Sequence, residues 1–351
     1  MGGPDRHDVV GTLHRIAFLL ERKQESSYRS RAYRTAGDVL RALDDDAWRA
    51  HVSDGRWQDL PGIGDRTAGV IATVLAGEEP RTLTELEADL AERNRAATPA
   101  GQALRDRLRG DLHAHTEASD GSASLADMAL AAVEIGHEYQ AITDHSPRLT
   151  VANGLSPARL RAQLGRIEAL NRSLAGAAPR PFRVLSGIEV DVLDDGSLDQ
   201  EPELLRRLDV VVASVHSKLR MDSAPMTRRM LAAVADPRVN VLGHCTGRLV
   251  EGSRGTRPRS EFDARAVFAA CAENGVAVEI NSRPERQDPP DDLIAIALEE
   301  GCLFSIDSDA HAPGQLSLID HGAERAEAAG VPPERIVTTW GLERLRAWAR
   351  G

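Results

Sequence analysis

With 351 residues, the chain is long enough for two domains, and 42% hydrophobic with 28% charged residues argues against disorder. A net charge of −11 argues against a surface coated for nucleic acid, and no stretch approaches the ~20 apolar residues of a membrane-spanning helix. The N-terminus lacks a signal-peptide pattern, and three cysteines without a CxxC pair argue against a disulfide scaffold. We therefore expect a cytoplasmic protein with no membrane partner.

The first ninety residues read as helices. Apolar residues recur at spacings of three and four over residues 8–23 and again over residues 30–43. Residues 60–71, Leu-Pro-Gly-Ile-Gly-Asp-Arg-Thr-Ala-Gly-Val-Ile, form a tight glycine turn between two short helical stretches. Small and polar residues then predict a linker. We expect an all-α domain over residues 1–90, a linker over residues 91–109 and a second domain over residues 110–351.

Short, apolar, β-branched runs alternate with helical segments after residue 110, which predicts a parallel sheet with helical crossovers. The expected strands span residues 111–115, 140–143, 182–188, 209–215, 239–242, 276–280 and 303–306. Helical spacing and capping residues lie between them, over residues 125–135, 157–174, 263–274 and 291–300. Seven strands favour an α/β barrel of the TIM type over an open sheet.

Six of the eleven histidines lie at the ends of predicted strands. They are His113, His115, His145, His216, His244 and His311, and carboxylates occupy matching places at Asp120, Glu189 and Asp309. A lone histidine is more commonly structural, but six in the same relation to strand ends indicate a shared site. In a parallel barrel these ends converge on one face, and imidazole with carboxylate suits zinc, manganese or iron.

The residues around these histidines resemble the polymerase and histidinol phosphatase (PHP) family from about residue 110 to the C-terminus. The resemblance rests on His113-Ala-His115-Thr, Ser119-Asp120-Gly121, Thr143-Asp-His145, Gly187-Ile-Glu189-Val-Asp, Ser214-Val-His216, Gly243-His244 and Asp309-Ala-His311. Three further segments are similar to the branch attached to bacterial family X DNA polymerases. They are His244-Cys-Thr-Gly-Arg248, Glu279-Ile-Asn281 and Thr339-Trp340-Gly-Leu-Glu-Arg-Leu.

This resemblance implies a distorted seven-stranded PHP barrel with three divalent ions, Mn²⁺ or Zn²⁺, with iron also suited. Carried over by position, His113, His115, Glu189 and Asp309 hold the first ion. Glu189 bridges to a second ion, completed by His216 and His244, while Asp120, His145 and His311 hold the third. The residues expected to be catalytic are Glu189, Asp309 and His311.

Phosphoester hydrolysis is the reaction class that such a centre predicts. Clustered divalent ions lower the pKa of a bound water, so that hydroxide is available near neutral pH, and they neutralise a phosphate. No side-chain nucleophile is needed, which fits the absence of a GxSxG elbow and of a phosphate-binding GxxxxGK[ST] loop. Arg220, Arg248 and Arg283 lie near strand ends, where they either clamp phosphate oxygens or serve as surface charge.

Residues 1–90 resemble the helix-hairpin-helix domain of family X polymerases in Tyr28-Arg-Ser-Arg-Ala-Tyr-Arg34 and Leu60-Pro-Gly-Ile-Gly64. There Gly62 and Gly64 let backbone N–H groups approach a DNA phosphate, with Arg29, Arg31, Arg34 and Arg66 supplying positive charge. The alternative is a small structural helical domain. Residues 1–90 carry 12 basic and 16 acidic residues, whereas residues 22–41 carry six and two. We expect modest, salt-sensitive DNA binding.

Two departures from the polymerase pattern narrow the function. Val70 occupies the position of the family's lyase lysine, and valine cannot form a Schiff base, so no lyase activity is expected by that route. Only the linker separates the two domains, where a polymerase carries its palm and thumb, so no polymerase activity is expected either.

Three hypotheses remain. The first is a metal-dependent phosphoesterase acting on DNA ends, either a 3′–5′ exonuclease or a 3′-end-processing enzyme involved in DNA repair. The second is a small-molecule phosphatase of the histidinol-phosphatase type. The third is a DNA-end-binding protein whose metal site is structural.

Overall fold

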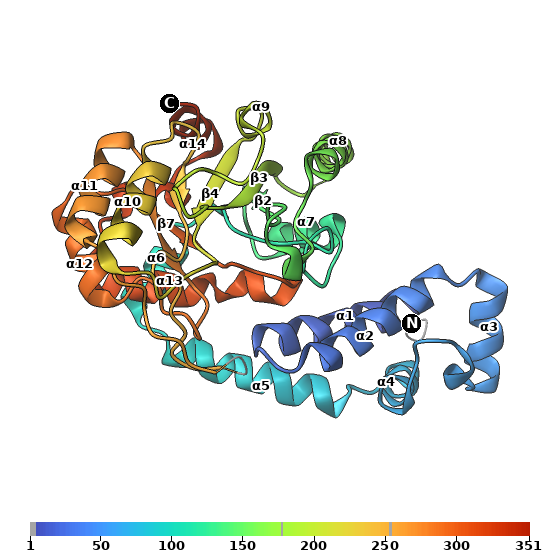
Figure 1. Cartoon of the computed structure of the whole chain (residues 1–351). Coiled ribbons are helices and arrows are strands. Elements are labelled where there is room, and N and C mark those ends of the chain that lie inside the picture. The colour runs from blue at the N-terminus through green and yellow to red at the C-terminus, as the bar shows by residue number, and fades with distance from the viewer. Residues whose placement is uncertain (1–4, 177, 253–254) are drawn as a thin grey trace. The chain divides into compact units, whose positions relative to one another are not determined.

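The computed structural model describes residues 5–176, 178–252 and 255–351, and the chain divides into two compact units between Ala97 and Thr98. The first unit is entirely helical, and the second is an α/β barrel whose strands are surrounded by helices (Figure 1). The two units are taken in turn.

The helical unit contains five α-helices and one 3₁₀ turn in its described residues. Their bounds are α1 Arg6–Arg22, α2 Ser27–Ala42, α3 Asp45–Asp54, η1 Trp57–Asp59, α4 Asp65–Leu75 and α5 Arg81–Ala96. The Asp5 carboxylate caps α1 by accepting a hydrogen bond from the Asp8 backbone N–H at 3.1 Å. The apolar residues predicted to share one face of α1 are buried. Leu13, Ile16 and Leu20 pack with residues of α2 and α4 into one apolar core.

The glycine turn lies between η1 and α4, as the sequence predicts. Gly62 has φ +93°, and a Cβ atom there would lie 2.8 Å from Thr35 Cγ2. A side chain is therefore disfavoured twice, by the backbone conformation and by the closeness of α2. Gly64 precedes α4, and its N–H donates to Thr67 Oγ1 at 3.0 Å.

Residues 91–109, for which the sequence predicts a linker, are largely helical. They hold the end of α5 and all of α6, Pro99–Arg105, which the Thr98 side chain caps by accepting from the Gly101 N–H. Leu104 and Leu108 are buried in the largest core cluster of the barrel unit. Small and polar residues hide the helical pattern of this segment in the sequence. The two leucines, together with an ion pair at 2.8 Å between Arg105 and Asp320, hold it on the barrel unit.

Seven parallel strands form the barrel in chain order, which confirms the predicted fold class. They are β1 Gly110–Asp111, β2 Tyr139–Ile142, β3 Arg183–Asp191, β4 Val210–Ser214, β5 Val241–Leu242, β6 Ala277–Asn281 and β7 Phe304–Asp307. β1 and β5 are shorter than the runs that predict them. The connecting helices include α7 Leu125–Glu134, α8 Pro157–Leu174, α9 Pro202–Leu205, α10 Ser223–Val234, α11 Ala264–Asn274 and α12 Asp291–Glu299.

Side chains and a short bridge join β1 to β7, which nearly closes the barrel. The Leu112 N–H donates to Asp307 Oδ1 at 2.8 Å, and the Ser308 N–H donates to Asp111 Oδ1 at 3.3 Å. Just beyond, Ala114 and Ala310 form a parallel bridge. Two carboxylates thus take the place of ladder hydrogen bonds, which explains why the regular strand at β1 ends early.

The segment after β7 comprises η3 Pro313–Leu318, α13 Ile319–Ala328, η4 Pro333–Arg335, η5 Val337–Thr339 and α14 Leu342–Ala349. Helix α13 packs against β6 and β7, while the part from η5 to α14 covers the end of the barrel where the strands begin. Val337, Trp340 and Leu345 pack with barrel residues such as Leu185, and the Tyr139 hydroxyl donates to the Trp340 carbonyl at 3.0 Å. The opposite end, where the strands finish, carries the polar side chains described below. In the described part of the chain, no helix has the length and apolar character to cross a bilayer.

Candidate metal centre

The nine predicted ligands form one connected cluster at the carboxyl ends of the barrel strands. Glu189 lies within β3, and the other eight lie in the loops that follow β1, β2, β4, β5 and β7. The chain places His113 and His115 two residues apart after β1, and Asp309 and His311 two residues apart after β7. His113 and His115 occupy alternate positions, so their side chains face the same cluster. Asp309 and His311 do not follow this alternation, because Asp309 has φ +50° and the turned backbone brings His311 Nδ1 to 2.9 Å from the Asp309 carbonyl oxygen.

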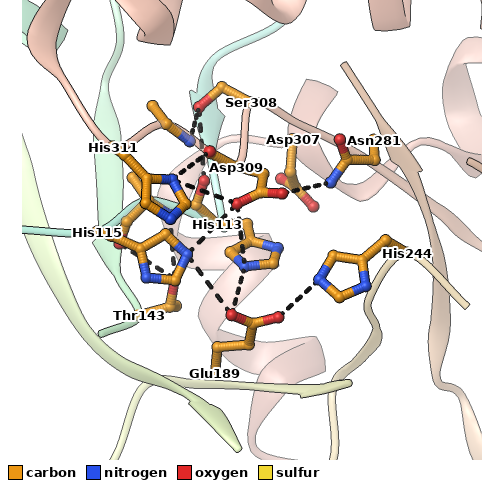
Figure 2. Close-up of polar contacts among 12 residues, drawn as sticks. His113, His115, Thr143, Glu189, His244, Asn281, Asp307, Ser308, Asp309 and His311 are labelled. Atoms are coloured by element: carbon orange, nitrogen blue, oxygen red, sulfur yellow. Dashed lines mark hydrogen bonds and ion pairs between the residues drawn. The ribbon is translucent and has the colours of Figure 1, made fainter. Parts of the chain in front are cut away.

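Glu189 is the centre of this cluster (Figure 2). Its Oε1 atom lies 2.8 Å from His244 Nε2 and 3.1 Å from His216 Nε2. Its Oε2 atom lies 2.9 Å from His145 Nδ1 and 3.3 Å from His113 Nε2. His115 Nε2 also lies 3.6 Å from Oε2. One carboxylate therefore faces five imidazoles through both oxygens, which is the arrangement expected of a bridging ligand.

Asp120, His145 and His311 form the more open side of the cluster. The Asp120 carboxylate lies 3.5 Å from His145 Nε2 and 3.5 Å from His311 Nε2. The side chains of Asp120 and His311 are 34% and 25% exposed, whereas those of His113 and His115 are fully buried. A molecule arriving from solvent therefore meets this side first.

The donor atoms fit divalent cations. His115 Nε2, His113 Nε2 and Glu189 Oε2 are buried and have no hydrogen-bond partner, although they face one another. Within three groups, ligand atoms lie within 4.8 Å of each other: His115, Asp120, His145 and His311; His113, His115 and Glu189; and His145, Glu189 and His216. Buried polar atoms nearly always have a hydrogen-bond partner, so several that converge without one have the arrangement of metal ligands.

Burial and neighbouring charges set the protonation states of Glu189 and His115. Burial alone would raise the pKa of Glu189, but His216, His113 and His145 together hold that pKa well below its usual value. The pKa of His115 falls to about 3, because burial and the neighbouring His311 and His145 disfavour its protonated form. Glu189 is thus a carboxylate and His115 a neutral imidazole at pH 7, the protonation states in which both can bind a metal.

Several partners of these ligands did not emerge from the sequence. Asp191, two residues after Glu189 on β3, lies 3.3 Å from His216 Nδ1 through its Oδ1 atom. Arg286 donates from Nε to Asp309 Oδ2 at 2.9 Å. The buried Asp144 accepts from the Thr116 N–H at 2.8 Å and so holds the loop that carries Asp120. For Asp191, the alternation along β3 was an available signal; the other two contacts depend on loop conformations.

The three arginines predicted to clamp phosphate have different surroundings. Arg283 lies beside the cluster: its Nη1 atom is 3.2 Å from His311 Nδ1 and donates to the Asp309 carbonyl at 2.9 Å. Arg248 turns to the backbone instead, donating from Nε to the carbonyls of Arg286 and Gln287. Arg220 is exposed on the loop between β4 and α10.

The predicted DNA-contacting residues of the helical unit also divide. Arg31 and Arg66 are exposed, and Arg29 is half-buried beside Glu25. Arg34 instead makes an ion pair at 2.7 Å with Glu21, and the two side chains are only 12% and 3% exposed. Its guanidinium is committed to the interior. Val70, at the position of the family's lyase lysine, is buried in the apolar core.

Comparison with known families matches both units. A helix-hairpin-helix domain model matches residues 4–79, and a PHP domain model matches residues 111–283. The chain is 33% identical over 243 residues to the DNA polymerase/3′-5′ exonuclease PolX of Bacillus subtilis, a match that covers 69% of this chain and 41% of that protein. The chain thus spans about two fifths of that relative's length.

Two further similarities each cover about two thirds of the chain. The probable phosphatase YcdX of Escherichia coli K12 is 28% identical over 237 residues, covering 65% of this chain and 88% of that protein. Among solved structures, a histidinol phosphate phosphatase from Lactococcus lactis, complexed with zinc, L-histidinol and phosphate, is 17% identical with a TM-score of 0.47. That match covers 64% of this chain and 94% of the other.

Proposed function

The chain belongs to the PHP family and carries a helix-hairpin-helix domain before its PHP domain; from this premise we propose that it is a metal-dependent phosphoesterase that hydrolyses DNA ends. The activity would be that of a 3′–5′ exonuclease or a 3′-end-processing enzyme in DNA repair. Its three cysteines are free and buried, in keeping with the cytoplasmic location that the sequence predicts.

One observation carries the hydrolytic part of the proposal. Six histidines and three carboxylates from six strands converge around Glu189, with buried donor atoms that lack hydrogen-bond partners. A purely structural cluster of this size would leave expensive desolvated groups uncompensated. We assign the nine residues to three divalent ions, Mn²⁺, Zn²⁺ or iron, in the sets that the family resemblance implies.

The residues of the chain then have distinct tasks. Bound divalent ions would supply positive charge to the phosphate and lower the pKa of water. Glu189 holds the buried part of the centre together, while Asp309 and His311 extend it to the open side. Asp120 and His311 are the most exposed ligands in contact with each other, so the scissile phosphate is expected beside them. Arg283 lies next to His311, and because Glu285 pairs with it at 2.7 Å, clamping a phosphate oxygen would require it to exchange that partner.

The DNA part of the proposal rests on the helical unit. By the family resemblance, backbone N–H groups of the hairpin that contains Gly62 and Gly64 would contact phosphates without reading sequence, and the Gly64 N–H would exchange Thr67 Oγ1 for a phosphate oxygen. Arg29, Arg31 and Arg66 are available to add positive charge, and Arg34 is left out because it pairs with Glu21. Neither polymerase nor lyase activity is proposed, since Val70 replaces the lysine that a lyase would need.

A small-molecule phosphatase is the second candidate. The similarity to a probable phosphatase covers 88% of that protein, and an overall charge of −11 suits a small substrate better than a long polyanion. A DNA-end-binding protein with a structural metal site is the third. All three make different predictions for one assay.

That assay compares two substrates at matched enzyme concentration after Mn²⁺ or Zn²⁺ is restored to chelator-treated protein. A 5′-labelled single-stranded oligonucleotide should be shortened to a ladder, while histidinol phosphate releases little phosphate. Phosphate release from histidinol phosphate alone would establish the second candidate and refute nuclease activity. DNA binding with no hydrolysis of either substrate, with or without metal, would establish the third.

A further inference from the structure

β6 differs from the other six strands of the barrel. Neither the strand nor the loop after it contributes any of the nine expected ligands. The inner face of β6 nevertheless becomes polar towards its carboxyl end: Ala277 is followed at alternate positions by Glu279 and Asn281, which are 0% and 1% exposed. Val278 and Ile280 point the other way, into the core between sheet and helices. A buried carboxylate at this depth needs strong partners.

The ligands themselves are those partners. Glu279 Oε1 lies 2.6 Å from His113 Nδ1, and Glu279 Oε2 accepts from the His244 N–H at 2.5 Å. One side chain of β6 therefore holds a ligand that follows β1 and another that follows β5. A hydrogen bond donated from His113 Nδ1 to this carboxylate leaves the Nε2 atom of His113 to face Glu189.

Asn281 links Glu279 to the ligand that follows β7. Its Nδ2 group donates to Glu279 Oε2 at 3.1 Å and to Asp309 Oδ2 at 3.2 Å. Figure 2 shows the Asn281 amide directed at the Asp309 carboxylate, on the side away from His113 and His115. Asp309 Oδ2 is thus occupied by Asn281 and Arg286, whereas Oδ1 faces the histidines at 3.5 Å from His115 Nε2.

We propose that Glu279 and Asn281 are positioning residues of the metal centre, which fix His113, His244 and Asp309 with one donor atom each directed at the cations. This proposal rests on the metal site of the proposed function. Polar groups behind the ligands set their tautomer and orientation, and losing such a group typically reduces metal affinity ~10–100-fold.

Glu279→Gln tests the proposal because the amide cannot match its surroundings. Both carboxylate oxygens face donors, whereas a glutamine offers one acceptor and one NH₂ group. In one orientation the NH₂ group opposes the His244 N–H; in the other it meets His113 Nδ1 and favours the tautomer with the proton on Nε2. The variant therefore keeps the size of the side chain but disturbs one ligand or the other.

The measurement is a titration of chelator-treated protein with Co²⁺, followed by visible absorption and by competition with a chelating dye. Glu279→Gln should bind its tightest ion ~10–100-fold more weakly, with an altered spectrum. Asn281→Ala should show a smaller loss, of several-fold. Wild-type affinity and spectrum in Glu279→Gln would overturn the proposal.

Glu21→Gln is the matched control, since Glu21 is also buried, but in the helical unit and paired with Arg34. It should leave Co²⁺ binding unchanged, and an equal loss there would mean that the effect is a general one of removing a buried carboxylate. If Glu279→Gln does not fold, NMR of the zinc-loaded wild-type protein decides: a proton on His113 Nδ1 is expected, and a proton on Nε2 contradicts the proposal.

No substrate is present in the titration, so the outcome is separate from that of the proposed function. A chain that loses Co²⁺ affinity on Glu279→Gln yet hydrolyses neither DNA nor histidinol phosphate would keep the positioning role and refute the phosphoesterase. Normal Co²⁺ binding in the variant, with an active wild-type enzyme, would refute the positioning role and keep the phosphoesterase.

Discussion

The helical unit and the barrel use their interiors differently. In the described residues of the helical unit, the buried polar side chains are Glu21, Ser30 and Thr67, and the rest of its core is apolar. The barrel is apolar between its strands and helices and at the end covered by Trp340, but its other end is filled with histidines and carboxylates. The interior of the helical unit stabilises its fold, whereas the polar end of the barrel interior is suited to binding ions.

This difference indicates how each unit is vulnerable. An apolar core loses stability when a contact is removed, in proportion to the area exposed. A buried polar cluster holds like and unlike charges out of water, so that its stability depends on protonation and on the ions it binds. Substitutions in the two units should therefore separate stability from activity.

The largest effect is expected for Glu189→Gln. It removes the charge that faces five histidines, so phosphoester hydrolysis should fall by roughly 10²–10³-fold or more, as when a preorganised charge is lost from an active site. Single-turnover hydrolysis measures this, with oligonucleotide binding as the control that should not change. Full activity in this variant would refute a metal centre bridged by Glu189.

Arg34→Ala should affect the stability of the helical unit rather than hydrolysis. It takes the guanidinium away from the buried Glu21 carboxylate, and breaking a buried ion pair costs about 3 kcal/mol. Urea unfolding should report the loss. Arg31→Ala, at an exposed position of the same helix, is the matched control and should change the free energy of unfolding by less than ~0.5 kcal/mol. Equal effects would mean that Arg34 is a surface residue.

Acid should weaken the barrel through His137, which is buried away from the nine ligands. Burial, reinforced by Arg105, lowers the pKa of His137 to about 3. The unfolded chain takes up a proton below pH ~6.5 and the folded chain does not, so stability decreases as pH falls from ~6.5 towards 3. Between pH 7 and pH 5 the loss is about 2 kcal/mol.

Chelator-treated wild-type protein and His137→Leu, each unfolded in urea at both pH values, provide the measurement. The wild-type free energy of unfolding should fall by about 2 kcal/mol more than that of the variant, because leucine cannot titrate. The same fall in both proteins would assign the acid sensitivity to other groups of the barrel.

The smallest effect is expected for Arg29→Ala combined with Arg31→Ala. Removing two partly or fully exposed charges should weaken oligonucleotide binding by roughly tenfold at low salt and reduce its salt dependence. Hydrolysis of a small phosphoester should not change. Unaltered DNA affinity would favour a structural role for the helical unit and, with it, the small-molecule phosphatase.

The two units also differ in how far the sequence predicts them. Spacing of apolar residues predicts α1 and α2, and glycines predict the hairpin at Gly62, because these patterns arise within a few residues of each other. The pattern predicts seven strands, but not the short length of β1, because its pairing is taken over by Asp307 from the other end of the barrel. Helix α6 is missed because its anchors, Leu104, Leu108 and the ion pair of Arg105 with Asp320, all act on partners distant in the sequence.

By itself, the sequence determined the fold class and the candidate ligands, since both follow from local periodicity and from residue types at strand ends. Only the tertiary structure decided what each polar group faces. Arg34 turns from a predicted DNA contact into a partner of Glu21, and Glu279, which the sequence marks only as part of a segment similar to family X polymerases, becomes the partner of His113 and His244. The physical reason is range: periodicity reflects neighbours three or four residues apart, whereas Glu279 and His113 are 166 residues apart and meet only when the barrel closes.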